Sequence, residues 1–279
     1  MLIFVAATLS FTATFSSTAT SYSAVKSSSA PQQAPAAPQA PAPAPTAPQA
    51  ASPLSVVVLD PAHGGSDSGA RGPSGVLESE AVLDFARVIR GALEAQGFRV
   101  VVTRDGNQDP SFDDRSTLVN SISDAVFISL HVSSTGPIGT ARAYSYVFPN
   151  QAPGDPADAA LTPKTQLFAS LSGPRHPGLV EWNLAQKNFV ARSQKLAELA
   201  QIQLAQKFQG SPDLPLQAPA RQLRTVAAPA IAIEVSSVAV PNAQKLAQMG
   251  QPLADSVARA LADFRASLRG GATGPGEAH

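Results

Sequence analysis

The fold class follows from residues 54–103, which read LSVVVLDPAHGGSDSGARGPSGVLESEAVLDFARVIRGALEAQGFRVVVT. Ser55 to Leu59 is nearly continuous in apolar, β-branched residues, which is typical of a strand buried on both faces. From about Glu80 to Gln96 the apolar residues recur every three or four positions, which predicts an amphipathic helix that Gly97 ends. Phe98 to Thr103 is a second apolar run and predicts the next strand.

The same alternation of apolar runs and helical patterns continues toward the C-terminus. Further strands are predicted at Ala125–Leu130, Arg142–Phe148 and Ala230–Val235. Further helices are predicted from a cap at Asp113 or Asp114 to Ile122, from Gln194 to Phe208, and from Ala243 to Leu268. We therefore predict one α/β domain, with a twisted, mostly parallel or mixed sheet of about six strands and helices on both faces.

The segments outside this pattern suggest export. Residues 1–24 contain a short apolar run followed by small polar residues, which predicts a signal peptide or an anchor, although no Lys or Arg precedes the run. Residues 25–53 are rich in Ala and Pro and predict a flexible linker. We expect the folded domain at 54–268, with an insertion at about 149–183 and a disordered tail at 269–279. The expected location is the periplasm or cell envelope.

Composition excludes several classes of function. The formal net charge is zero and the pI is about 6.9, so neither nucleic acid nor an anionic membrane is favoured as a partner. The chain contains no cysteine, which excludes disulfides, thiolate metal sites and cysteine nucleophiles. We expect a monomer.

Three polar residues stand at or just beyond the ends of predicted strands. They are His63, His131 and Glu234. Ligand crevices form at the carboxyl ends of strands in open α/β sheets, so these side chains can converge. A single histidine is more often a packed imidazole, but two at strand ends, each beside Gly or Ser, favour a shared site. Glycines around His63 indicate close approach or positive φ.

A carboxylate near the start of the first helix can complete a metal site. Glu78 and Glu80 are both candidates, and an acidic residue there can also simply favour the helix dipole. Two imidazoles and one carboxylate form a known ligand set for catalytic zinc. A second carboxylate, such as Glu234, can then serve as general acid and base. Spacing alone leaves this a hypothesis.

Several blocks of the sequence resemble the zinc-dependent N-acetylmuramoyl-L-alanine amidases of bacterial cell-wall turnover. The blocks are LDPAHGGSDSGARGPSGVLESEAVLDFA, VVVTRDG, DDRSTLVNSISDAVFISLHVSS and APAIAIEVSSVAVPN, and the similarity spans about Val56 to Leu268. The resemblance implies a mixed α/β fold and peptidoglycan as the partner. It also implies hydrolysis of the amide between the lactyl group of N-acetylmuramic acid and the L-Ala of the stem peptide.

Carried over by position, the resemblance assigns the site. It makes His63, Glu78 and His131 the Zn²⁺ ligands and Glu234 the catalytic carboxylate, and so chooses Glu78 over Glu80. Asp60, Asp67 and Arg115 also match family positions, as groups that orient the ligands or support the structure. The chain departs from the family pattern at Ala62, after His131 (Val-Ser-Ser) and after Glu234 (Val-Ser-Ser).

These departures keep an alternative open, namely a catalytically weak or inactive peptidoglycan-binding or regulatory module of the same fold. A third reading keeps the hydrolase but changes the amide that is cut. In some relatives a segment near the insertion carries a helix that blocks the cleft until a partner removes it. The insertion is therefore either a plain surface loop or a segment controlled by an activator protein.

Overall fold

The computed structural model describes residues 54–149 and 181–270. The predicted signal peptide or anchor, the linker, most of the insertion and most of the tail lie outside the described residues. Among the described helices, none combines the length and the apolar character that crossing a membrane requires.

The described chain alternates strands and helices, as predicted. The strands are β1 Val56–Pro61, β2 Arg99–Val102, β3 Ala125–Ser133, β4 Thr140–Tyr146, β5 Leu216–Ala218 and β6 Ala230–Ser236. The helices are α1 Glu78–Ala95, α2 Phe112–Asn120, the 3-10 helix η1 Trp182–Asn188, α5 Val190–Lys207, α6 Arg221–Arg224, α7 Ala243–Ala247 and α8 Gly250–Gly270.

One mixed sheet of six strands organises these elements, in the order β2-β1-β3-β6-β4-β5. Strand β4 runs antiparallel to β6, and every other pair of neighbours is parallel. The central strands β1, β3 and β6 are therefore parallel, and their carboxyl ends meet at one edge. The prediction of a single α/β domain with a mixed sheet is confirmed.

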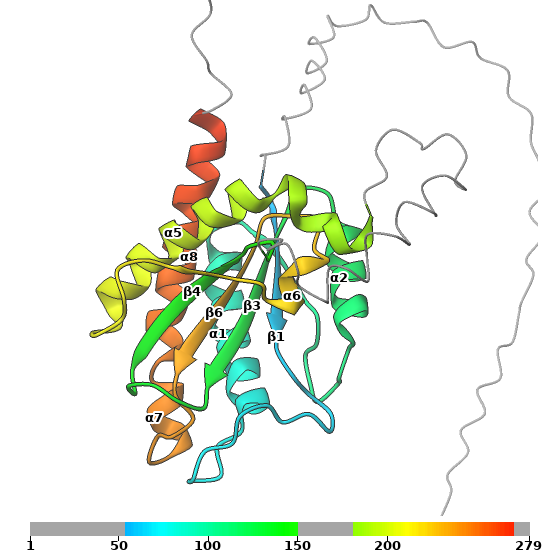
Figure 1. The fold of residues 1–279 in the computed structure, drawn as a ribbon. Coiled ribbons are helices and arrows are strands. Elements are labelled where there is room, and N and C mark those ends of the chain that lie inside the picture. Colours follow the sequence, from blue (N-terminus) through cyan, green and yellow to red (C-terminus); the bar gives the residue numbers. More distant parts are fainter. Residues whose placement is uncertain (1–53, 150–180, 271–279) are drawn as a thin grey trace, which may run out of the picture. The chain divides into compact units, whose positions relative to one another are not determined.

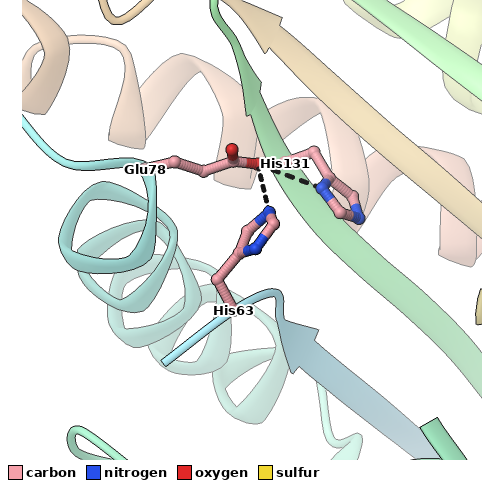
Figure 2. A group of neighbouring side chains, drawn as sticks. All are labelled: His63, Glu78 and His131. Carbon is pink, nitrogen blue, oxygen red and sulfur yellow. Dashed lines mark hydrogen bonds and ion pairs between the residues drawn. The ribbon is translucent and has the colours of Figure 1, made fainter. Parts of the chain in front are cut away.

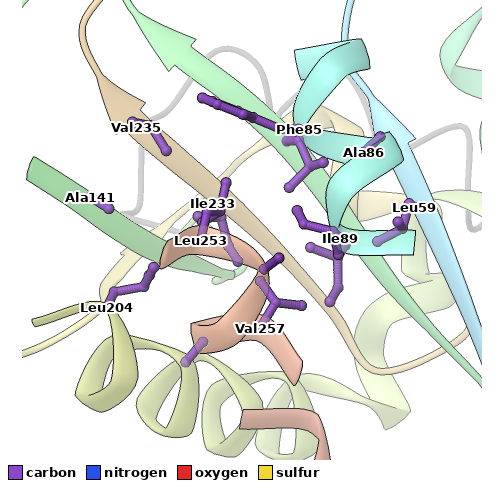
Figure 3. Close-up of a cluster of buried hydrophobic side chains, with 14 of the residues drawn as sticks. Leu59, Phe85, Ala86, Ile89, Ala141, Leu204, Ile233, Val235, Leu253 and Val257 are labelled. Carbon is purple, nitrogen blue, oxygen red and sulfur yellow. The ribbon is translucent and has the colours of Figure 1, made fainter. Parts of the chain in front are cut away.

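Helices α1, α5 and α8 cover one face of the sheet and enclose the larger core (Figures 1 and 3). Phe85 and Ile89 of α1 pack there with Leu59 of β1 and Ile233 of β6, all at most 2% exposed. Burial of each such side chain stabilises the folded state by about 1.5–3 kcal/mol relative to leaving it exposed to water. The periodic apolar face read from the sequence is the face that α1 buries.

Helices α2 and α6 cover part of the opposite face, where a smaller apolar cluster includes Val119, Phe127 and Leu223. Along β3 the side chains alternate between the two faces, so Ser129, His131 and Ser133 follow Phe127 on this second face. The apolar cluster thus gives way to polar side chains toward the carboxyl ends of the strands.

Several predicted boundaries are wrong; α5, for example, begins at Val190 and not at Gln194. Strand β3 runs to Ser133, so His131 lies within the strand and not after it. The cap of α2 is Ser111, since its hydroxyl accepts from the Asp114 amide while the Asp114 carboxylate accepts from Ser111. The closing helix is two helices, α7 and α8, because Pro252 lacks an N–H and is tolerated only in a first turn.

Arg104, just after β2, joins the loop that follows β1 to the start of α1. Its guanidinium, on a residue only 4% exposed, donates to the carbonyls of Pro61, Ala62 and Ser79 at 2.7–2.8 Å. One side chain therefore ties the segment before His63 to the first turn of α1.

We expect Arg104→Met to lower the free energy of unfolding by about 2–4 kcal/mol, since it leaves buried carbonyls without donors. Arg90→Met is the matched control, because Arg90 forms an exposed pair with Glu94 worth at most about 0.5 kcal/mol. Urea unfolding of both variants measures the difference. Equal, small effects would show that the Arg104 contacts do not stabilise the fold.

Candidate metal centre

Three elements bring His63, Glu78 and His131 together, as Figure 2 shows. His63 lies in the loop after β1, Glu78 is the first residue of α1, and His131 is in β3. One ligand atom from each lies within 4.8 Å of the others. The rival Glu80 is exposed and outside this group. The three residues form a group that can hold a metal ion.

Glu78 stands between the two imidazoles. Its Oε1 lies 3.2 Å from His63 Nε2 and 3.0 Å from His131 Nδ1, and accepts from the Val132 amide at 3.0 Å. Its Oε2 accepts from the Ala70 amide at 2.8 Å. Both carboxylate oxygens are thus held by backbone donors, which fixes the carboxylate facing the two ring nitrogens.

The charges of this group are strongly coupled. The hydrogen bond to Glu78 contributes most to the pKa of His63, burial opposes it, and the hydrogen bond to Asp67 adds to the rise, so the pKa is raised to about 9. Burial alone would raise the pKa of Glu78, but hydrogen bonds from His131 and His63 outweigh it and hold that pKa well below its usual range. Glu78 is therefore ionised in the folded protein. Its carboxylate and the unprotonated ring nitrogens of His63 and His131 are donors that suit a divalent ion.

We expect the metal-free protein to lose stability as the pH rises through about 9, where folded His63 deprotonates. The folded-state pKa exceeds the unfolded value of about 6.5, so the stabilisation is complete below 6.5 and vanishes above 9. Urea unfolding of chelated protein at about pH 6 and about pH 9.5 measures this loss. The free energy of unfolding of the His63→Asn variant should fall less over the same pH interval. An equal fall in both proteins would show that His63 is not the group responsible.

The loop of His63 has a left-handed backbone at consecutive residues, with φ of 63° at His63, 128° at Gly64 and 57° at Gly65. Gly69 also has a positive φ, of 61°. A Cβ at Gly69 would lie 2.6 Å from both Glu78 Oε2 and His63 Cδ2. Only glycine fits where the loop passes the two side chains.

We expect Gly69→Ala to displace Glu78 or His63 and to weaken metal binding by at least about tenfold, as loss of supporting contacts at metal sites does. Gly75→Ala is the matched control, because Gly75 also has a positive φ (81°) but its Cβ would meet nothing within 4 Å. Both variants carry the same kind of backbone strain. Zinc titration of the two proteins distinguishes the effect of backbone strain from that of the steric clash with Glu78 and His63. Equal zinc affinities in the two variants would contradict the role of Gly69.

Further side chains contact the ring nitrogens of the two histidines that do not face Glu78. Asp67 Oδ2 lies 2.7 Å from His63 Nδ1. Ser129 Oγ lies 3.3 Å from His131 Nε2 and donates to the buried Asp60 at 2.8 Å. A carboxylate on the outer nitrogen of a metal-binding histidine is a common arrangement that fixes the ring and its tautomer.

Asp60 in turn pairs with Arg115, whose Nη1 lies 2.5 Å from Asp60 Oδ1. Both residues are at most 5% exposed. Arg115 also donates to the His63 carbonyl at 3.0 Å. This buried pair therefore supports both histidines, one through Ser129 and the other through the backbone.

Glu234 lies on β6, where it is the register partner of His131 on β3. Directly paired residues point to the same face of a sheet, so Glu234 stands beside the three-residue group without belonging to it. The Tyr144 hydroxyl donates to Glu234 Oε1 at 3.3 Å. Burial and the neighbouring Glu234 raise the pKa of Tyr144, which keeps the phenol protonated as a donor.

Sequence reasoning missed several residues that support the site: Arg104, Ser129, Tyr144 and Gln222, whose Nε2 lies 3.4 Å from His131 Nε2. Ser129 precedes His131 by two positions in a strand, so period-2 alternation would have placed both on one face. No sequence signal identifies Gln222, which lies in the four-residue helix α6.

Comparisons with known proteins place the chain in a family. A family model described as N-acetylmuramoyl-L-alanine amidase matches residues 57–263. The N-acetylmuramoyl-L-alanine amidase AmiC of Neisseria meningitidis is 29% identical over 201 residues, covering 68% of this chain and 47% of AmiC. AmiC of Escherichia coli O6:H1 is 28% identical over 232 residues, covering 78% of this chain and 54% of that protein. The chain thus spans about half the length of these curated relatives.

Solved structures share the fold. The CwlD amidase of Clostridioides difficile, solved in complex with the GerS lipoprotein, superposes with a TM-score of 0.54 at 14% identity. The superposition covers 76% of this chain and 99% of CwlD.

Proposed function

We propose that this chain, which belongs to the N-acetylmuramoyl-L-alanine amidase family, hydrolyses the amide bond between N-acetylmuramic acid and L-alanine in peptidoglycan. The family match confirms the resemblance read from the sequence. The observation that carries the activity is the grouping of His63, Glu78 and His131 beside Glu234. These four residues provide a site for a cation and a separate carboxylate next to it.

Zinc is the proposed cofactor, because two imidazole nitrogens and one carboxylate form one of its common catalytic ligand sets. The ion would be held by His63 Nε2, His131 Nδ1 and a Glu78 carboxylate oxygen, since these two ring nitrogens are the ones that face Glu78. When bound, zinc polarises a carbonyl and lowers the pKa of water. The support of His63 by Asp67, and of His131 by Ser129 and Asp60, fits such a site.

Glu234 is the proposed general acid and base. It takes the proton of the water that attacks the amide carbon, and then gives this proton to the departing nitrogen of L-Ala. Tyr144 donates to Glu234 Oε1, and we propose Oε2 as the oxygen that exchanges the proton. The hydroxyl thereby orients the carboxylate without taking part in the transfer.

A second candidate function is a binding or regulatory module with little activity. It is favoured by the altered segments after His131 and Glu234. Ser133 and Ser236 of these segments are register partners on β3 and β6 and line the hollow beside Glu234. The complete set of four polar residues favours the enzyme.

Digestion of purified peptidoglycan by the zinc-loaded protein separates the two functions. The amidase releases stem peptides that begin with a free L-Ala amine, which mass spectrometry identifies. Chelated protein is the control and should release none. Zinc-loaded protein that binds the polymer but releases no peptide would favour the binding module, and cleavage at another amide would change the substrate.

The location and partners follow from the same proposal. An enzyme with this substrate works in the periplasm or cell envelope, in agreement with the predicted export signal. We propose that it acts as a monomer. We also propose an activator protein as a partner, by analogy with CwlD, whose structure contains a lipoprotein. Cell fractionation and size-exclusion chromatography test location and oligomeric state.

A further inference from the structure

Glu234 has a charged neighbour on the side away from the metal group. Its register partner on the antiparallel strand β4 is Arg142, as its partner on β3 is His131. Directly paired residues point to the same face, so this face carries an imidazole, a carboxylate and a guanidinium on three adjacent strands. Glu234 stands between the proposed metal group and Arg142.

A hollow of about 250 Å³ lies beside Glu234 on the Arg142 side. Its described lining includes Arg142, Tyr144 and Glu234, together with residues of the turn between β3 and β4. Arg142 and Glu234 are the charged residues among this described lining, so Arg142 supplies its positive charge. Glu234, which would transfer the proton, therefore forms part of the wall of this hollow.

Arg142 has no carboxylate partner among the residues that the structure describes. Its interaction is with the Tyr144 hydroxyl, and Tyr144 in turn is the residue that donates to Glu234. A guanidinium presents its donors in a planar fork that matches a carboxylate. Arg142 is half-buried, which holds this fork at the wall of the hollow.

We propose that Arg142 is a specificity-determining residue that binds a carboxylate of the peptide part of the substrate. The inference rests on the proposed amide hydrolysis, because Glu234 would protonate the nitrogen from which the peptide continues. The metal group occupies the β3 side of Glu234, so the peptide extends over β4.

The distance from Glu234 to Arg142 suits a carboxylate on the second residue of the peptide. Adjacent strands lie about 4.8 Å apart, and two extended residues span about 7 Å. A carboxylate within two residues of the cleaved bond therefore reaches Arg142. Without Arg142, the negative charge of Glu234 would repel such a group.

Two synthetic N-acetylmuramoyl-L-alanyl dipeptides test this, one with free carboxylates on the second residue and one with carboxamides. We expect zinc-loaded wild-type protein to prefer the carboxylate form by about tenfold in kcat/KM, as a charge-assisted hydrogen bond allows. Arg142→Gln should remove the preference by slowing only the carboxylate form, and Arg142→Lys should retain part of it. The matched control Arg90→Gln, at an exposed position on α1, should keep the full preference.

Binding of the two product dipeptides, measured by calorimetry on the same proteins, gives a readout that needs no turnover. The same loss of discrimination is expected in Kd. A protein that hydrolyses neither substrate contradicts the proposed function, yet its binding ratios still test Arg142. Equal losses for both forms in Arg142→Gln, or no discrimination by the wild type, would overturn the proposal.

Discussion

Glu234→Gln is expected to lower kcat for amide hydrolysis by about 10²–10⁴-fold, the usual contribution of a general acid or base. The amide keeps the shape of the side chain and can still accept from the Tyr144 hydroxyl, so the geometry should remain. It cannot take up the proton of the attacking water. Because Glu234 is not among the three residues that can hold the metal, zinc content should stay at the wild-type level.

The measurement is kcat on a synthetic muramoyl peptide, with zinc content determined on the same preparation. Glu80→Gln is the control, since Glu80 is an exposed carboxylate near the start of α1 and outside the site. Its activity should be unchanged. A fully active Glu234→Gln protein would end the proposed mechanism.

His63→Ala should lose both zinc and activity. It removes one of three ligand atoms and leaves Glu78 and His131, so we expect the dissociation constant for zinc to rise by more than about 100-fold. Turnover should fall with the metal, at zinc concentrations that saturate the wild type. Competition with a chromophoric chelator measures the affinity.

Asp67→Asn provides a graded comparison. It keeps His63 but removes the carboxylate 2.7 Å from its outer nitrogen, so a smaller loss of about 10–100-fold in affinity is expected. The predicted order is wild type, Asp67→Asn, then His63→Ala. An Asp67→Asn protein that binds zinc more weakly than His63→Ala would contradict the assignment of His63 as a ligand.

Much of the fold could be predicted because its main elements have strong local patterns. The β-branched run of β1 and the apolar periodicity of α1 are both unambiguous, and alternation of such elements implies a layered α/β domain. The short elements β5 and α6 were missed. They have three and four residues, and their conformation depends on tertiary contacts such as the burial of Leu223.

The candidate site could be predicted only in part from physical reasoning. Strand ends single out His63, His131 and Glu234, but spacing does not decide between Glu78 and Glu80. Family resemblance chose Glu78, and the structure places that residue between the two imidazoles. The roles of Arg142 and Tyr144 depend on which strand pairs with β6, and strand order is not encoded in any local pattern.

The most direct measurement is an anomalous-difference map from crystals of the zinc-loaded protein, recorded at the zinc absorption edge. We predict one strong peak about 2.0–2.2 Å from His63 Nε2, His131 Nδ1 and a carboxylate oxygen of Glu78, with Glu234 beside it and not bound to it. A zinc-loaded crystal with no peak among these three residues, or with the ion held elsewhere, would contradict the account.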